Sequence, residues 1–515
     1  MLDEMKGDAL PRIDFVWLLA FLGVGGGIWA CTPPSPVAGA STSEASDFRH
    51  PSYQNVLIEN VPHIRQKPDF CGEACAAMML NYLGEEVDQD YVFDAAGVDP
   101  SVGRGLVAAE LNRALIEIGF DTGAVWNPVR SKRDVYKQFA EMLTDLGQSI
   151  SSIVCMNTTD DAHSSEHFRL VLGYDAERDE VIYHEPAIED GAYRRMSTAD
   201  FIRLWPLHSA KDSDTVVRMK MLPKRLSFGE ISSQRTAADF VQHVIAKRSM
   251  MTSNFVIMVE PPFVVFGNGT PAQVAVHAKQ TVRWTVELLM RDYFTKEPTE
   301  ILDIWVFEDQ SSYMRYAEIL FNDIPDTPYG YYSSVDKAMV MNIGLGGGTL
   351  VHEIVHPFME ANFPTCPPWF NEGMGSLYEW PKDIDGRIYG VVNWRLDGLK
   401  YDIENAQLGS FERLMNLTHN EFYEDRAGAN YAQSRYLLQY LQYKRKLREY
   451  YQEFTAHAHD DPSGLNTLKR LMHITDMKAF ERDWKDWVMN LVEGTVPLLA
   501  IPAVDNPVRS SSEVQ

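Results

Sequence analysis

Two histidines and two of the glutamates in the stretch HEIVHPFMEANFPTCPPWFNEG, residues 352–373, have the types and spacing of a zinc site. On a helix, His352 and His356 lie on one face, within reach of one ion. Glu353 lies beside them, where a carboxylate can act as a general base toward water. A catalytic zinc site also needs a third protein ligand, and Glu372 is the candidate. The pattern predicts one Zn2+ held by two imidazoles and a carboxylate.

Three prolines between the histidines and Glu372 are expected to make the turn that closes this site. Pro364, Pro367 and Pro368 end the first helix, because a proline cannot continue one. A second helix is predicted to restart at about Trp369 and to bring Glu372 back toward the ion. The alternative is a helix that exposes its two histidines as ordinary surface residues.

A second stretch, QKPDFCGEACAAMMLNYLG at residues 66–84, has the composition of a cysteine nucleophile at the start of a helix. A helix N-terminus favours the thiolate, so it is expected to lower the pKa of Cys71 and make a better nucleophile. Gly72 lets the backbone approach closely. The side-chain amide of Gln66 and the backbone N–H of Cys71 are candidate donors to an oxyanion.

A thiol hydrolase also needs a distant histidine as base and an acid that orients it. His167 opens the strand-like run HFRLVLGYD, and Glu185 ends the next one, VIYHEP. If the two strands pair as a hairpin, these side chains lie side by side. His163 and His184 are competing candidates for the base. A buried structural Cys71 with a turn histidine is the alternative to a catalytic site.

The elements that must position these residues form more than one unit, because 515 residues exceed what one hydrophobic core usually supports. The first unit, residues 50–222, has helices first and short strands from Ser152 onward, which is typical of an α+β domain with antiparallel pairing. The second unit, residues 254–494, begins with strands and helices in turn and becomes helical after the HExxH segment. A helical region, residues 223–253, connects them, and residues 495–515 are predicted to be a disordered tail.

The N-terminus, residues 1–31, is predicted to be an export signal or a membrane anchor. Its apolar run FVWLLAFLGVGGGIWA has the length of a signal peptide. The run ends at Cys31, and the low-complexity residues 32–49 that follow suggest a flexible tether. This arrangement resembles a bacterial lipobox, so Cys31 is expected to carry lipid and to hold the protein at a membrane of the cell envelope. An uncleaved anchor and a cleaved signal peptide are the alternatives.

The composition argues against a nucleic-acid partner. The chain has 72 acidic and 47 basic residues and a formal net charge of −25, whereas affinity for phosphates rests on lysine and arginine. Five cysteines are odd in number and too sparse for a disulfide framework. Cys75, Cys155 and Cys366 are therefore expected to be free thiols, buried as small hydrophobic residues.

Over residues 61–222 the chain resembles the C39-like peptidases of the papain-like superfamily. The resemblance implies that Cys71 is the nucleophile, His167 the base, Glu185 the orienting carboxylate and Gln66 an oxyanion donor. Glu73 replaces the usual proline, at a first helical turn where negative charge is favourable. Glu185 replaces the usual aspartate. The matching positions are Gln66, Asp69, Cys71, Gly72, Ala74, His167, Gly173, Tyr174 and Pro186.

Over about residues 254–492, HEIVH followed by NEG resembles the gluzincin clan of metallopeptidases, and most of all the bacterial peptidase MA-like domains. The resemblance implies a thermolysin-like fold with a mixed sheet and a helical C-terminal part. A Gly-x-Tyr strand precedes the zinc helix in that family, and residues 329–332 and 337–342 match it. A tyrosine on a later helix often stabilises the tetrahedral intermediate there, which implies this role for Tyr431. A tyrosine of the hydrophobic core is the alternative for Tyr431.

Together these patterns predict a multidomain α+β protein, an exported and membrane-tethered bacterial peptidase with a thiol centre and a zinc centre. Its partners would be peptide or protein substrates. Two other readings stay open. One is a peptide-binding scaffold in which one or both centres are inactive, and the other is a thiol transpeptidase or amidase of the cell envelope.

Overall fold

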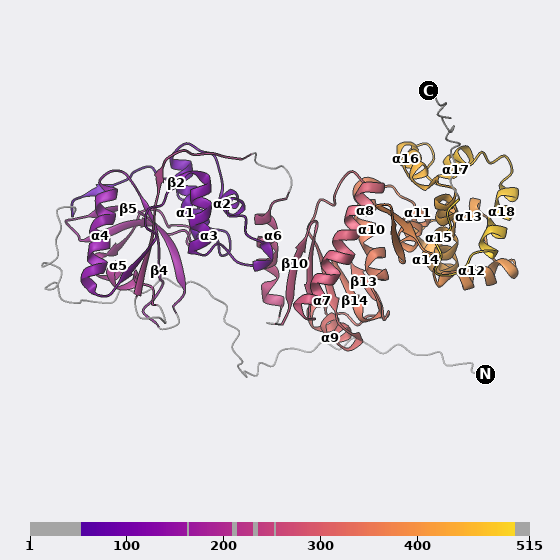
Figure 1. Cartoon of the computed structure of the whole chain (residues 1–515), viewed down its shortest axis with the longest axis horizontal. Coiled ribbons are helices and arrows are strands. Elements are labelled where there is room, and N and C mark those ends of the chain that lie inside the picture. The colour runs from indigo at the N-terminus through magenta and orange to yellow at the C-terminus, as the bar shows by residue number, and fades with distance from the viewer. Residues whose placement is uncertain (1–52, 162–163, 209–213, 230–234, 252–253, 500–515) are drawn as a thin grey trace, which may run out of the picture. The chain divides into compact units, whose positions relative to one another are not determined.

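The computed structural model describes residues 53–161, 164–208, 214–229, 235–251 and 254–499 (Figure 1). The predictions for Cys31, the export signal, the tether and residues 500–515 lie outside these ranges. Within the described ranges, no helix is both long and apolar enough to cross a membrane.

The N-terminal part is built around a sheet of seven strands. Six strands follow the order β3-β8-β4-β5-β6-β7, and β1 pairs with β5. All neighbouring strands are antiparallel, which confirms the expected pairing from Ser152 onward. The strands of this sheet are β1 (Val56–Leu57), β3 (Trp126–Val129), β4 (Ser152–Asn157), β5 (Glu166–Asp175), β6 (Glu180–His184), β7 (Arg194–Ser197) and β8 (Asp214–Lys220), and a separate pair is formed by β2 (Phe120–Asp121) and β9 (Leu222–Pro223).

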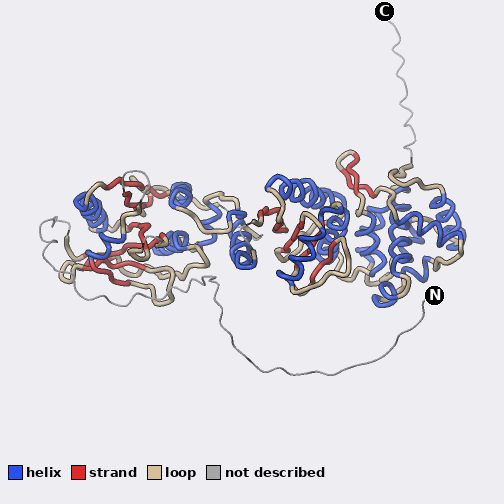
Figure 2. The backbone as a smooth tube through the Cα atoms, turned by 90° about the horizontal axis from the view of Figure 1, so that it is seen from below, coloured by secondary structure: helices blue, strands red, loops and turns tan. Residues whose placement is uncertain are grey.

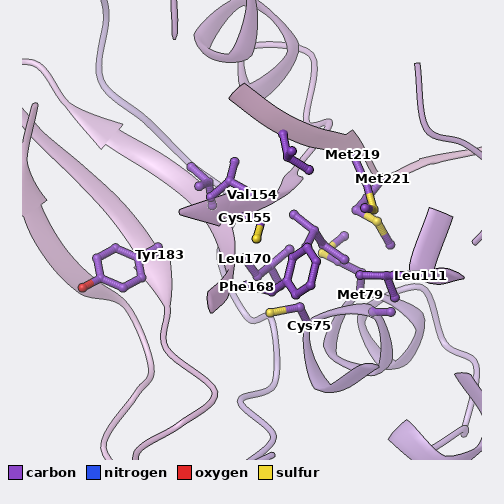
Figure 3. Close-up of a cluster of buried hydrophobic side chains, with 14 of the residues drawn as sticks. Cys75, Met79, Leu111, Val154, Cys155, Phe168, Leu170, Tyr183, Met219 and Met221 are labelled. Atoms are coloured by element: carbon purple, nitrogen blue, oxygen red, sulfur yellow. The ribbon is translucent and has the colours of Figure 1, made fainter. Parts of the chain in front are cut away.

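Helix α1 runs through the hydrophobic core of this part. All residues from 72 to 80 are buried, because the helix is apolar on most of its circumference. Figure 3 shows Cys75 of α1 and Cys155 of β4 within this cluster of buried side chains, as expected for free thiols. The helices of the N-terminal part are α1 (Cys71–Tyr82), α2 (Gln89–Ala95), α3 (Ala108–Ile118), α4 (Lys132–Leu146) and α5 (Thr198–Leu204).

A second, five-stranded sheet follows the connecting helix α6 (Ala237–Lys247), which lies in the region predicted to be helical. Its order is β10-β11-β12-β14-β13. The inner pairs β11–β12 and β12–β14 are parallel and the outer pairs antiparallel, so the sheet is mixed, as predicted. The strands are β10 (Val256–Glu260), β11 (Phe263–Gly267), β12 (Leu302–Phe307), β13 (Gly330–Ser333) and β14 (Ala338–Asn342).

Both faces of the second sheet are buried. Along β12, Ile304 and Val306 join the cluster that contains the C-terminal helices, whereas Trp305 and Phe307 join a smaller cluster with α9 on the other face. The helices beside this sheet are α7 (Pro271–Val276), α8 (Trp284–Asp292), α9 (Gln310–Phe321) and α10 (Gly348–Asn362). A π-helical segment, His277–Arg283, joins α7 to α8.

From α11 onward the described chain is helical apart from one hairpin, β15 (Pro381–Ile384) and β16 (Arg387–Gly390) (Figure 2). The described chain also continues past the predicted start of the tail, since Leu499 N–H donates to Tyr443 O. The helices are α11 (Pro368–Leu377), α12 (Arg395–Glu404), α13 (Phe411–Met415), α14 (His419–Glu424), α15 (Ala427–Tyr443), α16 (Leu447–His457), α17 (Leu465–Leu471) and α18 (Met477–Met489). The mixed α+β class is confirmed, and the thermolysin-like assignment stays a prediction.

Candidate active sites

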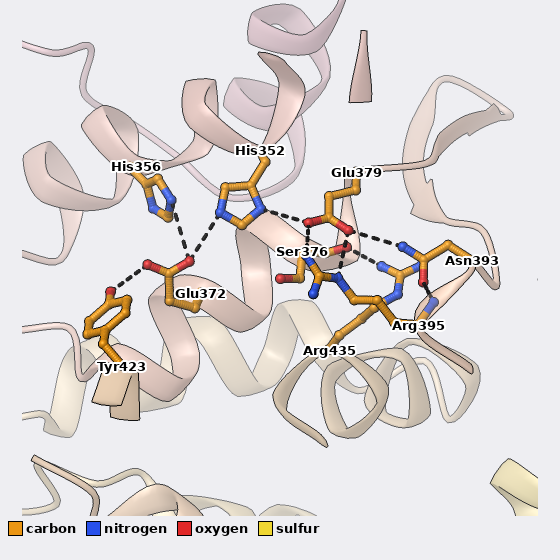
Figure 4. Close-up of polar contacts among 9 residues, drawn as sticks. All are labelled: His352, His356, Glu372, Ser376, Glu379, Asn393, Arg395, Tyr423 and Arg435. Carbon is orange, nitrogen blue, oxygen red and sulfur yellow. Dashed lines mark hydrogen bonds and ion pairs between the residues drawn. The ribbon is translucent and has the colours of Figure 1, made fainter. Parts of the chain in front are cut away.

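Helices α10 and α11 bring the three predicted metal ligands together (Figure 4). One ligand atom each from His352, His356 and Glu372 lies within 4.8 Å of the others. Nε2 of His352 is 3.1 Å from Oε2 of Glu372, and Nε2 of His356 is 3.7 Å from the same oxygen. The three side chains face one point, and two imidazole nitrogens with a carboxylate oxygen are a donor set that suits zinc.

The turn between the two helices lies where it was predicted, but Pro368 begins α11 instead of ending α10, and α10 continues through Pro357. Helix α10 ends at Asn362 and α11 begins at Pro368, close to the expected restart at Trp369. The helices also approach closely, because a Cβ added to Gly375 would lie 3.0 Å from two ring atoms of His352. A glycine is needed at this position if the imidazole is to keep its place.

Contacts that the sequence reasoning missed hold the second nitrogen of each imidazole. Asn371 Oδ1 is 3.1 Å from Nδ1 of His356, and Glu379 Oε1 is 3.2 Å from Nδ1 of His352. Arg395 in turn donates to both carboxylate oxygens of Glu379, over 2.9 and 2.6 Å. Such partners fix the orientation of ligating imidazoles, so both Nε2 atoms are turned toward Glu372. Only Asn371 carried a signal in the sequence, through its place beside Glu372.

The carboxylates around His352 favour its protonated form. Burial lowers the pKa of His352, but the contacts with Glu372 and Glu379 and the charge of Glu353 outweigh burial and raise the pKa to about 10. Burial raises the pKa of Glu372, but the hydrogen bond with His352 and the neighbouring histidines lower it to about 2. The ligand cluster therefore holds an imidazolium between carboxylates, a charge that a divalent cation would replace.

Two tyrosines lie near this cluster. Tyr423 of α14, which the sequence reasoning missed, donates a hydrogen bond of 2.5 Å to Oε1 of Glu372. The ring of Tyr431 on α15 lies 6.3 Å from the ring of His352 and 5.3 Å from the guanidinium of Arg395. Burial and the charge of Glu372 raise the pKa of Tyr431, so it is a neutral O–H donor at physiological pH. Its catalytic role stays a prediction.

Glu353 faces a cavity of about 310 Å³ that adjoins the metal ligands. His356 and Asn371 also line this cavity, and Tyr332 from the edge strand β13 contributes to it. A substrate that enters the cavity would therefore meet the predicted general base and one metal ligand together.

Cys71 is the first residue of α1, as predicted, but its thiol is not activated in this structure. Burial raises the pKa of Cys71 to about 12, while the backbone N–H of Phe168 and those at the helix start lower it by less. The expectation that the helix N-terminus would bring the pKa below its ordinary value is wrong, because desolvation of the thiolate outweighs the helix dipole. Gly72 has the predicted close approach, since an added Cβ would lie 2.6 Å from Leu111 Cδ2 and 3.1 Å from Phe168 Cδ2.

The hairpin of β5 and β6 brings His167 and Glu185 together, as predicted. Nε2 of His167 is 2.5 Å from Oε1 of Glu185. The sequence reasoning missed Arg169, whose Nε donates to Oε2 of Glu185 over 2.7 Å. Its position two residues after His167 on the same face of β5 was the available signal. Burial raises the pKa of Glu185, but His167 and Arg169 lower it to about 2, so the carboxylate stays charged.

The remaining candidates of the thiol site have different surroundings. The Gln66 N–H donates to Pro186 O over 2.9 Å, which ties the loop before α1 to the loop after β6. The Gln66 Oε1 atom is buried without a hydrogen-bond partner among the described residues, and its oxyanion role stays a prediction. His184 is fully buried against the ring of Tyr193, on β6 beside Glu185, and burial lowers its pKa to about 4. His163 lies outside the described residues.

Glu73 is fully buried rather than placed at a solvated helix start. Its Oε1 accepts the Leu106 N–H over 2.7 Å, and Oε2 has no hydrogen-bond partner among the described residues. Burial raises the pKa of Glu73 to about 8, although the Leu106 N–H acts in the opposite direction. The expectation of a favourable negative charge is therefore wrong, because Glu73 is mainly neutral at pH 7.

A Glu73→Gln variant is expected to remove a pH dependence of stability. The folded state holds a proton on Glu73 between its ordinary pKa of 4.5 and about 8, so the wild type loses stability as pH rises through this window. The glutamine cannot ionise, so the variant should gain about 4 kcal/mol relative to wild type between pH 5 and pH 9, at about 1.4 kcal/mol per pKa unit. Urea unfolding at both pH values checks this, with Glu117→Gln on the exposed face of α3 as control. An equal effect of both substitutions would contradict the assignment.

The N-terminal part has a counterpart among known protein families. Residues 58–211 match the model of the Peptidase_C39 like family, which covers less than a third of the chain. No curated protein matches the chain. The match supports a C39-like domain over residues 58–211, and it suggests a peptidase-like function for this part of the protein.

Proposed function

We propose that the protein hydrolyses peptide bonds at two separate centres, a zinc centre on α10 and α11 and a thiol centre on α1 and β5. The observation that carries the zinc centre is the convergence of His352, His356 and Glu372 within 4.8 Å, next to a cavity lined by Glu353. The thiol centre is supported by the family match and by the contact of His167 with Glu185.

At the zinc centre, His352, His356 and Glu372 would hold the ion, and Asn371 and Glu379 would keep the imidazoles in place. A bound Zn2+ would polarise the scissile carbonyl as a Lewis acid. Glu353 takes a proton from the attacking water and passes it to the leaving amine.

At the thiol centre, Cys71 attacks the scissile carbonyl and forms a thioester as the C–N bond breaks. Because the pKa of the thiol is raised to about 12, His167 must take the proton during the attack rather than before it. The same proton goes to the leaving amine, and water then hydrolyses the thioester. Glu185, held by Arg169, orients the imidazole.

One observation favours a second candidate function for the thiol centre. A thiol whose pKa is raised to about 12 has almost no thiolate at neutral pH. The N-terminal part could then bind peptides for the zinc centre without cleaving them. Export and a lipid tether at Cys31 belong to the same proposal on the basis of the sequence alone.

The test separates the two centres in the purified protein without residues 1–31. Wild type and Cys71→Ala are incubated with a peptide library, each with and without a zinc chelator. Two active centres predict that either treatment alone leaves part of the hydrolysis and that both together abolish it. If Cys71→Ala changes nothing, the thiol centre is a binding site. If the chelator changes nothing, the zinc centre is disproved.

A further inference from the structure

The cavity beside the metal ligands extends well beyond the catalytic residues. One of its walls is a single face of α10, formed by Glu353, His356 and Glu360, and Phe363 at the C-cap of this helix also lines the cavity. Glu353, His356 and Glu360 are three and four positions apart, as a continuous helix face requires. At about 310 Å³ the cavity is at the lower limit of ligand sites, so it suits one or two side chains of a longer substrate.

The far end of this wall carries a carboxylate without a partner. Glu360 has no hydrogen bond or ion pair with any described residue, and its side chain is exposed. The charge of Glu360 contributes to raising the pKa of Lys337, but Lys337 forms its ion pair with Glu300 and not with Glu360. The two positive charges of a zinc ion would offset the negative charges of Glu372 and Glu353. The carboxylate of Glu360 would then be the negative charge of the cavity that is not compensated.

The distance along the wall matches a long basic side chain. Glu353 and Glu360 are seven residues apart, about 10 Å along the helix axis. A peptide whose scissile carbonyl lies at Glu353 could therefore send one extended side chain toward Glu360. Pro357, which lies between the two carboxylates on α10, and Phe363, three residues after Glu360, also line the cavity and offer apolar contacts to a methylene stem. The phenol ring of Tyr332, also in the lining, could contact a cationic head group.

We propose that this cavity selects a lysine or arginine side chain beside the scissile bond, and that Glu360 is the residue that determines this specificity. The proposal rests on the proposed metallopeptidase function and adds its substrate class. The pair between Glu360 and the substrate is partly exposed to solvent, so the selectivity is about fivefold rather than absolute.

The test uses four peptides that differ at one position, with lysine, arginine, norleucine or glutamate beside the bond that is cut. The values of kcat/KM are measured in a Cys71→Ala background, so that only the zinc centre contributes. With Glu360 unchanged, kcat/KM should be about fivefold higher for the lysine and arginine peptides than for the norleucine peptide. Glu360→Gln should bring this ratio close to one, and Glu360→Lys should invert it in favour of the glutamate peptide. Glu318→Gln on α9, which does not line the cavity, is the matched control and should keep the ratio.

A second measurement does not depend on turnover. Fluorescence anisotropy on a Glu353→Gln background should give a lower Kd for the lysine peptide than for the norleucine peptide, and Glu360→Gln should abolish the difference. Turnover with no preference, or a preference that survives in Glu360→Gln, would overturn the specificity and leave the peptidase function intact. Absence of turnover on every peptide would remove the proposed function, and equal binding of all four peptides would then overturn the specificity as well.

Discussion

Replacement of Glu353 by glutamine should lower metal-dependent peptide hydrolysis by about 100- to 10,000-fold, the range in which a general base contributes. Glutamine keeps the size of the side chain and its place in the cavity, but it cannot accept a proton from water. Glu353 is not among the three residues that converge on one point, so zinc content should stay at about one ion per chain.

Replacement of His352 by alanine should remove both zinc and turnover, whereas Glu353→Gln should remove turnover and keep the zinc. His352 supplies one of the three ligand atoms, so its loss leaves only His356 and Glu372 to hold the ion. Zinc content and kcat/KM are measured on the same samples in a Cys71→Ala background. Together they distinguish the loss of a general base, in Glu353→Gln, from the loss of a metal ligand, in His352→Ala. Glu318→Gln serves as the control for both values. Full activity of Glu353→Gln with zinc retained would contradict the assigned role.

Replacement of Glu185 by glutamine should destabilise the N-terminal part by about 3–5 kcal/mol, because it leaves a buried guanidinium without its counter-charge. Arg169 and Glu185 are each only 9% exposed, and Nε of Arg169 donates to Oε2 of Glu185 over 2.7 Å. The loss should appear in urea unfolding near pH 7. Thiol-dependent hydrolysis should fall in the same variant, because His167 loses its charged partner.

A double variant distinguishes the structural role of Glu185 from its catalytic role. Glu185→Gln with Arg169→Met removes both charges from the interior, so most of the lost stability should return. Thiol-dependent activity should stay low, since His167 still lacks a carboxylate. Recovery of activity together with stability would show that Glu185 acts only as a structural residue.

The pH dependence of the wild type provides an independent check on Glu185. Its pKa is lowered to about 2 from an ordinary value of 4.5. The stability that the carboxylate contributes is therefore present above pH 4.5 and is lost as the pH falls toward 2. In Glu185→Gln this acid-dependent loss should be smaller. An unchanged acid transition would mean that the contact with His167 and Arg169 contributes little to stability.

The sequence by itself predicted the arrangements that depend on local spacing. Two histidines on successive turns of one helix, a proline turn and a restarted helix are enough to bring Glu372 to His352. A β-hairpin is likewise enough to pair His167 with Glu185. In each case the contacting residues lie within about twenty positions, so backbone geometry alone limits where the side chains can be.

Only the tertiary structure decided what surrounds these residues. Arg395 reaches Glu379, and Tyr423 reaches Glu372, from helices whose packing no local pattern determines. The protonation of Cys71 was also decided by the tertiary structure. Its position at a helix start predicted a lowered pKa, whereas burial raises the pKa. Desolvation depends on every element that covers a group, and the cover of Cys71 includes strand β5, almost a hundred residues away in the sequence. Local spacing therefore brings the reacting groups together, and global packing determines their protonation.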